Sequence, residues 1–253
     1  MCCLGITPVS HAQDKLVIGS FSFPPLLHLT ENRKFSGTLS ETIYETCEQA
    51  GIECVFRLLP LKRAYNDLRK NRVDGLVTLD LAQFNDCCLS SDWHSPWSAG
   101  FFSSDPYLSI PNKAEDTFDI PFIISHGMQS PYSFIPKMDE WIEQKKINVF
   151  KGKDIESAIR MFVHKRANLL WGGEDFKWYL NKIAPGFSYD YKPLFHKNVV
   201  LWVRKEKEEI LNRFNQAYRK LIKENVIGHD GILAPKIMRQ RYEEADIKLQ
   251  PDS

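Results

Sequence analysis

The hydrophobic pattern changes its period from one segment of the chain to the next. Residues 15–21 (KLVIGSF) form an apolar run of the length of a buried strand. In residues 38–51 apolar side chains recur every three to four positions, which predicts an amphipathic helix. The stripe consists of Leu39, Ile43, Cys47 and Ala50. Thr38 and Glu41 have the spacing of a capping box and Gly51 suits the helix end, so the first two elements are a strand and a capped helix.

Three further segments continue this alternation. Residues 52–60 and 73–80 have the apolar runs of strands, and residues 61–72 between them have the pattern of a short helix. Strands that are joined through helices pair in parallel, because the crossover returns the chain to the same end of the sheet. The pattern therefore predicts a βαβαβ unit that ends at the carboxylate of Asp80.

A similar cassette recurs in residues 147–175. It runs from a strand through the N-cap Asp154 into an amphipathic helix, and then through a basic turn into a strand that ends at Glu174 and Asp175. Its apolar and basic positions match those of residues 52–80 in order, which predicts two similar α/β lobes. A chance match of two generic βαβ units is the alternative.

Two segments can carry the chain between these lobes. Residues 98–104 (SAGFFSS) lead out of the first lobe and residues 198–204 (NVVLWVR) lead back, and two crossovers make a hinge. The last helix of the pattern has an apolar face with which it can dock onto a lobe. This face consists of Leu211, Phe214, Tyr218, Leu221 and Ile222.

Composition and charge exclude several classes of function. The 253 residues, 43% hydrophobic and 26% charged, can bury the core of one large domain or two lobes. Lysine and arginine number 33 against 32 acidic residues, so the net charge of +1 offers nucleic acid no basic field, and we expect no such partner. The G-x-S-x-G, H-E-x-x-H and glycine-rich phosphate motifs are missing and the seven histidines are scattered, so we expect no enzyme, metal or cofactor.

Residues 1–13 have the features of the end of an export signal. Ser10 and Ala12 give the small-x-small pattern of a signal-peptidase site, and charged sequence begins at Gln13 or Asp14. The apolar part is short and no basic residue precedes it, so we expect the true start of the signal to lie upstream. A terminus without function is the alternative. No later segment approaches the ~20 apolar residues of a membrane span, so we expect a soluble periplasmic chain.

Four cysteines remain after this signal. Cys47 lies at the end of the first predicted helix and Cys54 at the start of the next strand, a separation over which a tight turn can bring the two sulfurs into a disulfide. Two buried thiols are the alternative. Cys87 and Cys88 are adjacent, and the sequence does not indicate their state.

The order and spacing of six motifs resemble those of the family-3 extracellular solute-binding proteins. The motifs are LVIGSFSFPPL, FSGTLSETIYE, RLLPLKRAYNDLRKNRVDGLVT, SPWSAG, KGKDIESAIRMFVHKRANLL and RFNQAYRKLIKENVIGHDGI. The resemblance implies the type II periplasmic binding fold: an α/β protein with two lobes, each a mostly parallel sheet flanked by helices, joined by two crossover strands. After the signal remnant 1–13 we expect residues 14–103 to form the first part of lobe 1, residues 104–200 lobe 2, and residues 201–253 the return to lobe 1 with C-terminal helices. We expect a monomer.

The resemblance also implies a ligand-binding cleft between the lobes. Phe21 and Phe23 follow the first strand and would form one wall of it, held rigid by Pro24 and Pro25. The residues themselves favour the same position, because open α/β sheets bind ligands at the carboxyl ends of their strands. Burial of Phe23 in the core is the alternative.

Further candidates in lobe 1 lie near the ends of the other strands. Arg63 begins a helix and could hold a carboxylate or phosphate, or could lie on a solvated helix face. Thr78 and Asp80 end the third strand and face the same crevice by position. Trp97 follows a loop proline and could stack on a ligand or pack in the core or hinge.

Lobe 2 contributes a second set of candidates to the cleft. They are Gln129, Ser130, Tyr132, Trp171, Glu174 and Asp175. The first three, with Gly127, lie where a strand leads into a helix, whose first amides favour an anionic group. The last three close the second cassette, where the resemblance implies an acidic residue that pairs with a ligand amine. A solvated N-cap is the alternative role of Asp175.

One departure from the family pattern bears on the ligand. Amino-acid binders of this type usually carry a threonine followed closely by an arginine that grips the ligand's α-carboxylate. After Thr78 this sequence has Gln83 and Asn85 instead, which argues against a standard amino acid. We expect a small polar solute, amino-acid-like or another small charged metabolite, that is captured for delivery to an ABC permease. A sensing module that signals to a membrane receptor is the alternative.

Overall fold

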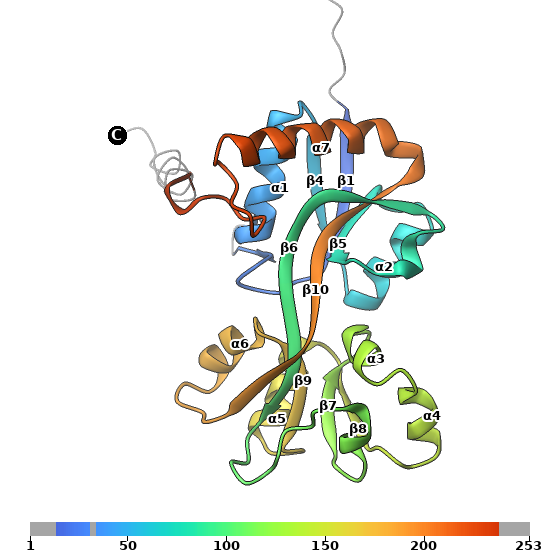
Figure 1. Cartoon of the computed structure of the whole chain (residues 1–253), viewed down its shortest axis with the longest axis vertical. Coiled ribbons are helices and arrows are strands. Elements are labelled where there is room, and N and C mark those ends of the chain that lie inside the picture. Colours follow the sequence, from blue (N-terminus) through green and yellow to red (C-terminus); the bar gives the residue numbers. More distant parts are fainter. Residues whose placement is uncertain (1–13, 31–33, 238–253) are drawn as a thin grey trace, which may run out of the picture.

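The computed structural model describes residues 14–30 and 34–237, and Figure 1 shows two lobes joined by two long strands. We call the upper one lobe 1 and the lower one lobe 2. The elements of lobe 1 are β1 (Lys15–Ser20), β2 (His28–Leu29), β3 (Phe35–Ser36), α1 (Thr38–Gln49), β4 (Glu53–Leu58), α2 (Leu61–Arg69), β5 (Gly75–Leu79), η1 (Ala82–Phe84), η3 (Lys205–Lys207) and α7 (Glu208–Lys223).

Lobe 1 has the βαβαβ topology that the sequence predicts. Strand β1 pairs in parallel with β4 on one side and with β5 on the other. The apolar run of β1 lies in the middle of this arrangement, with Leu16 and Ile18 fully buried. A central strand buries both faces, and this explains why its sequence is continuously apolar rather than alternating.

The predicted capping box of α1 is wrong, because the helix begins one residue earlier. Its N-cap is Gly37, and Thr38 is the first helical residue. Gly37 has φ 113°, and a Cβ there would overlap with the carbonyl groups of Pro25 and Leu26. Only glycine fits where the Pro24–Pro25 corner packs against the helix start. The Leu39 amide donates to the Leu26 carbonyl at 2.9 Å, so the corner also binds the first turn.

Lobe 2 repeats the arrangement with shorter elements. They are η2 (Ala114–Thr117), β7 (Phe122–Ser125), α3 (Ser130–Phe134), α4 (Met138–Glu143), β8 (Val149–Gly152), α5 (Ile155–Val163), β9 (Leu169–Gly173) and α6 (Phe176–Ile183). Strand β7 pairs in parallel with β8 on one side and with β9 on the other, so the two strands of the second cassette run parallel with β7 between them. The predicted N-cap of α5 is confirmed, because the Asp154 carboxylate accepts a hydrogen bond from the Ser157 amide at 2.8 Å.

Two long strands, β6 (Cys88–Ser103) and β10 (Asp190–Arg204), connect the lobes. They pair antiparallel over nearly their whole length, β10 also pairs with β5 of lobe 1, and β6 also pairs with β9 of lobe 2. The strand order is β4-β1-β5-β10-β6-β9-β7-β8. The predicted crossover segments therefore lie within one ladder that runs through both lobes (Figure 1).

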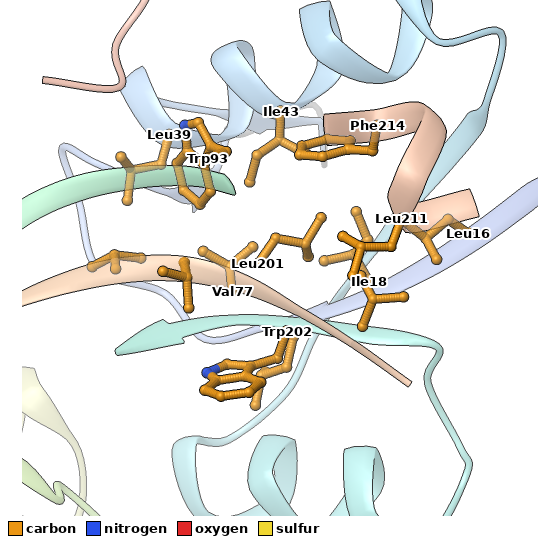
Figure 2. Close-up of a cluster of buried hydrophobic side chains, with 14 of the residues drawn as sticks. Leu16, Ile18, Leu39, Ile43, Val77, Trp93, Leu201, Trp202, Leu211 and Phe214 are labelled. Atoms are coloured by element: carbon orange, nitrogen blue, oxygen red, sulfur yellow. The ribbon is translucent and has the colours of Figure 1, made fainter. Parts of the chain in front are cut away.

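Each lobe has its own hydrophobic core. In lobe 1, α7 buries Leu211, Phe214, Tyr218 and Leu221, while Ile222 is half-buried. Figure 2 shows Phe214 and Trp93 on one side of the sheet and Trp202 on the other. Burial of one such side chain contributes about 1.5–3 kcal/mol, so α7 is held to the lobe mainly by this face.

The disulfide that the sequence analysis considers is present in lobe 1. Cys47 and Cys54 are joined, with 6.1 Å between their Cα atoms.

The two ends of the chain lie outside the described residues. These are the expected signal remnant, residues 1–13, and residues 238–253 of the expected C-terminal part. Among the described residues, no helix combines the length and apolarity that a membrane crossing requires.

Candidate functional site

The carboxyl ends of the strands of both lobes meet at a set of cavities between the lobes. The largest, of about 880 Å³, is lined from both lobes and from the two crossover strands. We call it the outer cavity. A second cavity of about 50 Å³, the central cavity, is lined by residues that follow β1, β7 and β9 and by the last residues of β5. A third, of about 510 Å³, is lined by Phe21 and Leu58–Lys62 of lobe 1 and by residues 153–156 of lobe 2.

Aromatic side chains form the lobe 1 wall of the central cavity. The ring centroids of Phe21 and Phe23 are 5.0 Å apart, and Tyr65 of α2 lies against Phe21 with a centroid distance of 6.5 Å. The Tyr65 and Thr78 hydroxyls are 3.2 Å apart and hydrogen-bonded. Phe23 lines this cavity and, at 5% exposed, is also part of the lobe 1 core, so it is both a wall residue and a core residue. The wall is rigid because each ring packs on the next.

Asp175 is the carboxylate that the outer and central cavities share. It follows β9 at the start of α6, but its side chain makes no capping hydrogen bond. Instead its Oδ1 accepts a hydrogen bond from Trp97 Nε1 of β6 at 2.9 Å. A Cβ at Gly173 would overlap with both of these side chains, so the glycine leaves the space in which they meet. Asp175 therefore occupies the N-cap position of α6, but its side chain does not cap the helix and is not free in solvent.

The environment of Asp175 disfavours its charge. Burial raises the pKa of this carboxyl to about 6, the Trp97 hydrogen bond opposes the rise, and the negative charge of Glu174 adds to it. A carboxylate that water solvates poorly gains from a cation brought close to it. The site can therefore bind a protonated amine and, near neutral pH, would present a charged carboxylate to it.

The outer cavity carries charges of both signs. Asp80 and Glu174 supply carboxylates, and Lys197 and His196 of β10 supply basic groups. Glu174 Oε1 is 2.8 Å from Lys177 Nζ, so part of its charge is already balanced. The cavity can thus receive a polar molecule with separated charges.

Most of the predicted site residues line these two cavities. The central cavity is lined by Phe21, Phe23, Thr78, Trp97, Gln129, Ser130 and Asp175, and the outer cavity by Asp80, Trp97, Glu174 and Asp175. They come from both lobes and from β6, as the resemblance implies. Their role in binding a ligand stays a prediction.

Three predicted residues lie elsewhere. The Arg63 side chain is 63% exposed on α2, with Nε 3.4 Å from Asp67, so the solvated helix face is its position. Tyr132 donates its hydroxyl hydrogen to Asp139 at 3.0 Å and lines none of the three cavities. Trp171 is fully buried in the lobe 2 core and donates from Nε1 to the Ser130 hydroxyl at 3.0 Å.

The helix start at which we expect an anion site is shorter than a dipole-based site requires. Helix α3 has only five residues, and Gln129 is its N-cap without a side-chain capping bond. The Gln129 side-chain amide donates to the Gly127 carbonyl at 3.2 Å. A helix this short has a weak dipole, because few peptide units are aligned.

Sequence reasoning missed several residues of the site. Tyr65 and Met128 line the central cavity, and His196, Lys197 and Asn198 line the outer one. Tyr65 lies on helix α2, so a search for residues at the carboxyl ends of strands does not find it. Burial raises its pKa to about 12, and the hydrogen bond to Thr78 opposes the rise.

The arrangement of strands is that of several solved proteins. An ancestral arginine-binding protein bound to arginine matches with a TM-score of 0.71 and 16% identity, over 92% of this chain and 99% of that one. A protein described as an L-cystine ABC transporter from Listeria monocytogenes matches with a TM-score of 0.70 and 16% identity, over 84% and 92%. A histidine kinase sensor domain with similarity to periplasmic binding proteins matches with a TM-score of 0.71 and 15% identity, over 94% and 97%.

The chain therefore has the type II periplasmic binding fold, and the fold prediction is confirmed. Neither a protein-family model nor a curated protein matches the sequence. Two of the three neighbours are named for binding or transport and the third for sensing.

Proposed function

We propose that this protein binds a small polar solute with a protonated amine in the cleft between its lobes, and that it is exported to do so. The observation that carries the proposal is the position of Asp175. It is a half-buried carboxylate on lobe 2 that lines both cavities, and Trp97 of the crossover strand orients it. A cation in contact with it would satisfy a charge that the protein itself leaves poorly solvated.

The lining residues narrow the class of solute. In the described part of the chain no arginine lines any of the three cavities, so a bidentate grip on an α-carboxylate has no donor there. In the outer cavity, Lys197 and His196 could donate hydrogen bonds to an anionic group in place of an arginine. We infer that the amine contacts Asp175, that apolar parts lie on Phe21 and Trp97, and that any anionic group of the solute points into the outer cavity.

Binding is coupled to movement of the lobes. The chain crosses between them in β6 and β10, and a ligand that contacts both lobes would favour their approach, because those contacts form fully only when the cleft is closed. The closed form is then what a membrane partner recognises. Delivery to an ABC permease is the role we favour, since one neighbour of the same fold is described as an ABC transporter protein.

A sensing role is the second candidate, and a specific observation favours it. The histidine kinase sensor domain matches 94% of this chain with a TM-score as high as that of the arginine-binding protein. In that case the closed lobes would signal to a membrane receptor rather than release the solute. Adjacent permease and ATPase genes would support transport, and an adjacent kinase or cyclase gene would support sensing.

A thermal-shift screen tests the binding proposal. Amines, amino acids, organic acids and short peptides are added singly, and a solute that binds only the folded protein raises the Tm. Each hit is then titrated by calorimetry into the wild type and into Asp175→Asn, which keeps an oxygen for the Trp97 hydrogen bond but loses the charge. We expect a 10- to 100-fold loss of affinity, since hydrogen bonds to charged groups contribute about 1.5–3 kcal/mol.

Asp119→Asn is the matched control for this titration. Asp119 is exposed in lobe 2 outside the three cavities, and asparagine tolerates its φ of 59°. It should bind as the wild type does. Hits with unchanged affinity in Asp175→Asn, or hits confined to anions without an amine, would contradict the proposed class of solute.

A further inference from the structure

Two adjacent cysteines lie in lobe 1 at the start of β6, away from the three cavities. Cys88 is 2% exposed, Cys87 is half-buried, and neither is part of the Cys47–Cys54 disulfide. Their Sγ atoms are 2.7 Å apart. This is closer than two sulfur atoms lie when they are merely packed together, and it approaches the bonded separation of about 2.05 Å.

We propose that Cys87 and Cys88 are a redox site that closes into a vicinal disulfide when the protein meets a disulfide oxidant. The proposal goes beyond ligand binding and does not depend on it. The backbone already holds the two side chains on the same side, so closure needs a movement of only part of an ångström between the sulfurs.

Hydrogen bonds fix the chain on both sides of the pair. The Cys87 amide donates to the Asp86 carboxylate at 2.9 Å, and the Cys87 carbonyl accepts from the Lys205 amide at 3.2 Å. Cys88 is paired with Arg204 in the β6–β10 ladder. Because the neighbouring backbone is held by these contacts, the closeness of the sulfurs is a property of the fold rather than of a free loop.

The two cysteines have different access to an oxidant. Cys87 is half-buried, so its sulfur can be reached, whereas Cys88 is enclosed. Burial raises the pKa of the Cys88 thiol, and the hydrogen bond with Cys87 raises it further. The positive charge of Arg204 opposes this rise and the negative charge of Asp86 adds to it. Cys87 is therefore the sulfur that attacks first, and Cys88 the one that resolves.

The reaction is an exchange with a disulfide such as glutathione disulfide. The Cys87 thiolate attacks one sulfur of the oxidant, forms a mixed disulfide, and releases one glutathione thiolate. The Cys88 sulfur, as it loses its proton, then attacks Cys87 Sγ and displaces the second glutathione thiolate. Two cysteine thiols are oxidised to one disulfide, one glutathione disulfide is reduced to two thiols, and the two protons pass to the released thiolates.

This bond would be easier to reduce than the Cys47–Cys54 disulfide. Adjacent Cα atoms across a trans peptide are about 3.8 Å apart, below the roughly 4.4–6.8 Å that disulfides prefer, whereas Cys47 and Cys54 are 6.1 Å apart. Strained disulfides have more oxidising potentials and are the labile ones. A ring closed between neighbours also removes almost no chain entropy from the unfolded state, so it is no structural staple. The site fits a reversible redox modification.

Tryptic peptide mapping tests this on the full-length protein, because cleavage separates the two pairs. Residues 73–113 carry only Cys87 and Cys88, and residues 35–57 carry only Cys47 and Cys54. The folded protein is treated with glutathione disulfide, quenched with acid, labelled with N-ethylmaleimide, and digested without reductant. We expect peptide 73–113 to be unlabelled and two hydrogens lighter than its dithiol. With graded dithiothreitol it should open at a roughly tenfold lower concentration than peptide 35–57.

Other outcomes would overturn the proposal. Two labels on peptide 73–113 while peptide 35–57 remains oxidised would mean that the ring does not close. A stable glutathione adduct on Cys87 with a labelled Cys88, or a dimer linked through Cys87, would equally contradict it. If the bond in peptide 73–113 were reduced only at a higher dithiothreitol concentration than the bond in peptide 35–57, the proposed ease of reduction would be refuted. Cys87→Ser and Cys88→Ser, each with one label on this peptide, calibrate the masses, and the wild-type result stands even if either variant folds poorly.

Discussion

Replacing Asp175 with asparagine should stabilise the protein without ligand, although the same change should weaken binding. The carboxyl has its pKa raised from 3.8 to about 6, so the folded state holds the proton more tightly than the unfolded chain does. The resulting stabilisation is fully present below about pH 4 and is lost as the pH rises through about 6. Near pH 7.5 the wild type therefore folds at the cost of a poorly solvated charge, which asparagine does not have.

The size of the effect follows from the shift. Each pKa unit corresponds to about 1.4 kcal/mol, so a rise from 3.8 to about 6 sets an upper limit of about 3 kcal/mol. The side chain is only half-buried and borders the open outer cavity, so water screens part of this cost. We expect Asp175→Asn to unfold with a free energy about 1–2 kcal/mol above the wild type at pH 7.5.

Urea denaturation between pH 4 and 8 measures this difference. Groups that titrate in both proteins cancel, so the gap between Asp175→Asn and the wild type should be near zero at pH 4, grow toward pH 6 and then stay level. Asp119→Asn, the exposed control in lobe 2, should show no such growth. A gap that is independent of pH, or an Asp175→Asn variant less stable than the wild type at pH 7.5, would refute the reasoning.

Three further substitutions test the fold and the cavity wall by urea denaturation. Asp154→Ala removes the cap on the Ser157 amide and should lower the free energy of unfolding by about 1 kcal/mol; no loss would mean that water replaces the cap. Phe214→Ala empties a fully buried site and should cost about 3–5 kcal/mol, and a loss below about 1 kcal/mol would contradict the docking of α7. Tyr65→Phe keeps the ring but loses the Thr78 hydrogen bond, so we expect a loss of about 0.5–1.5 kcal/mol, and unchanged stability would refute that bond.

The sequence predicts the local and repetitive parts of the fold well. The parallel βαβ units follow from periods that each segment carries by itself, and the Asp154 cap follows from residues three positions apart. The start of α1 does not follow in this way. Gly37 is the N-cap because the carbonyls of Pro25 and Leu26 leave no room for a Cβ, and nothing in residues 37–41 carries that information.

For the candidate site, the sequence predicts which residues lie at strand ends, but not the direction in which each side chain points. Thr78 lies at the end of β5, Asp80 follows β5, and Asp175 follows β9. The carboxyl ends of these two strands meet, so topology alone brings the three residues to the cavities. Trp171 lies within β9, before the strand end, and points into the lobe 2 core. Arg63 is on α2, where the orientation of the helix about its axis decides between cleft and solvent.

Contacts between distant segments complete the site and are invisible in one sequence. Trp97 and Asp175 are 78 positions apart, yet their hydrogen bond defines the shared edge of the outer and central cavities. Local patterns fix each residue's element, and only the packing of β6 against β9 brings the two side chains together.

A crystal structure of the protein with a solute from the thermal-shift screen tests the central claim most directly. We predict electron density for the solute between the lobes, with its amine nitrogen about 3 Å from the Asp175 carboxylate and with contacts to Phe21 of lobe 1. A solute bound outside the cavities that Asp175 lines, or one that contacts a single lobe, would contradict the account.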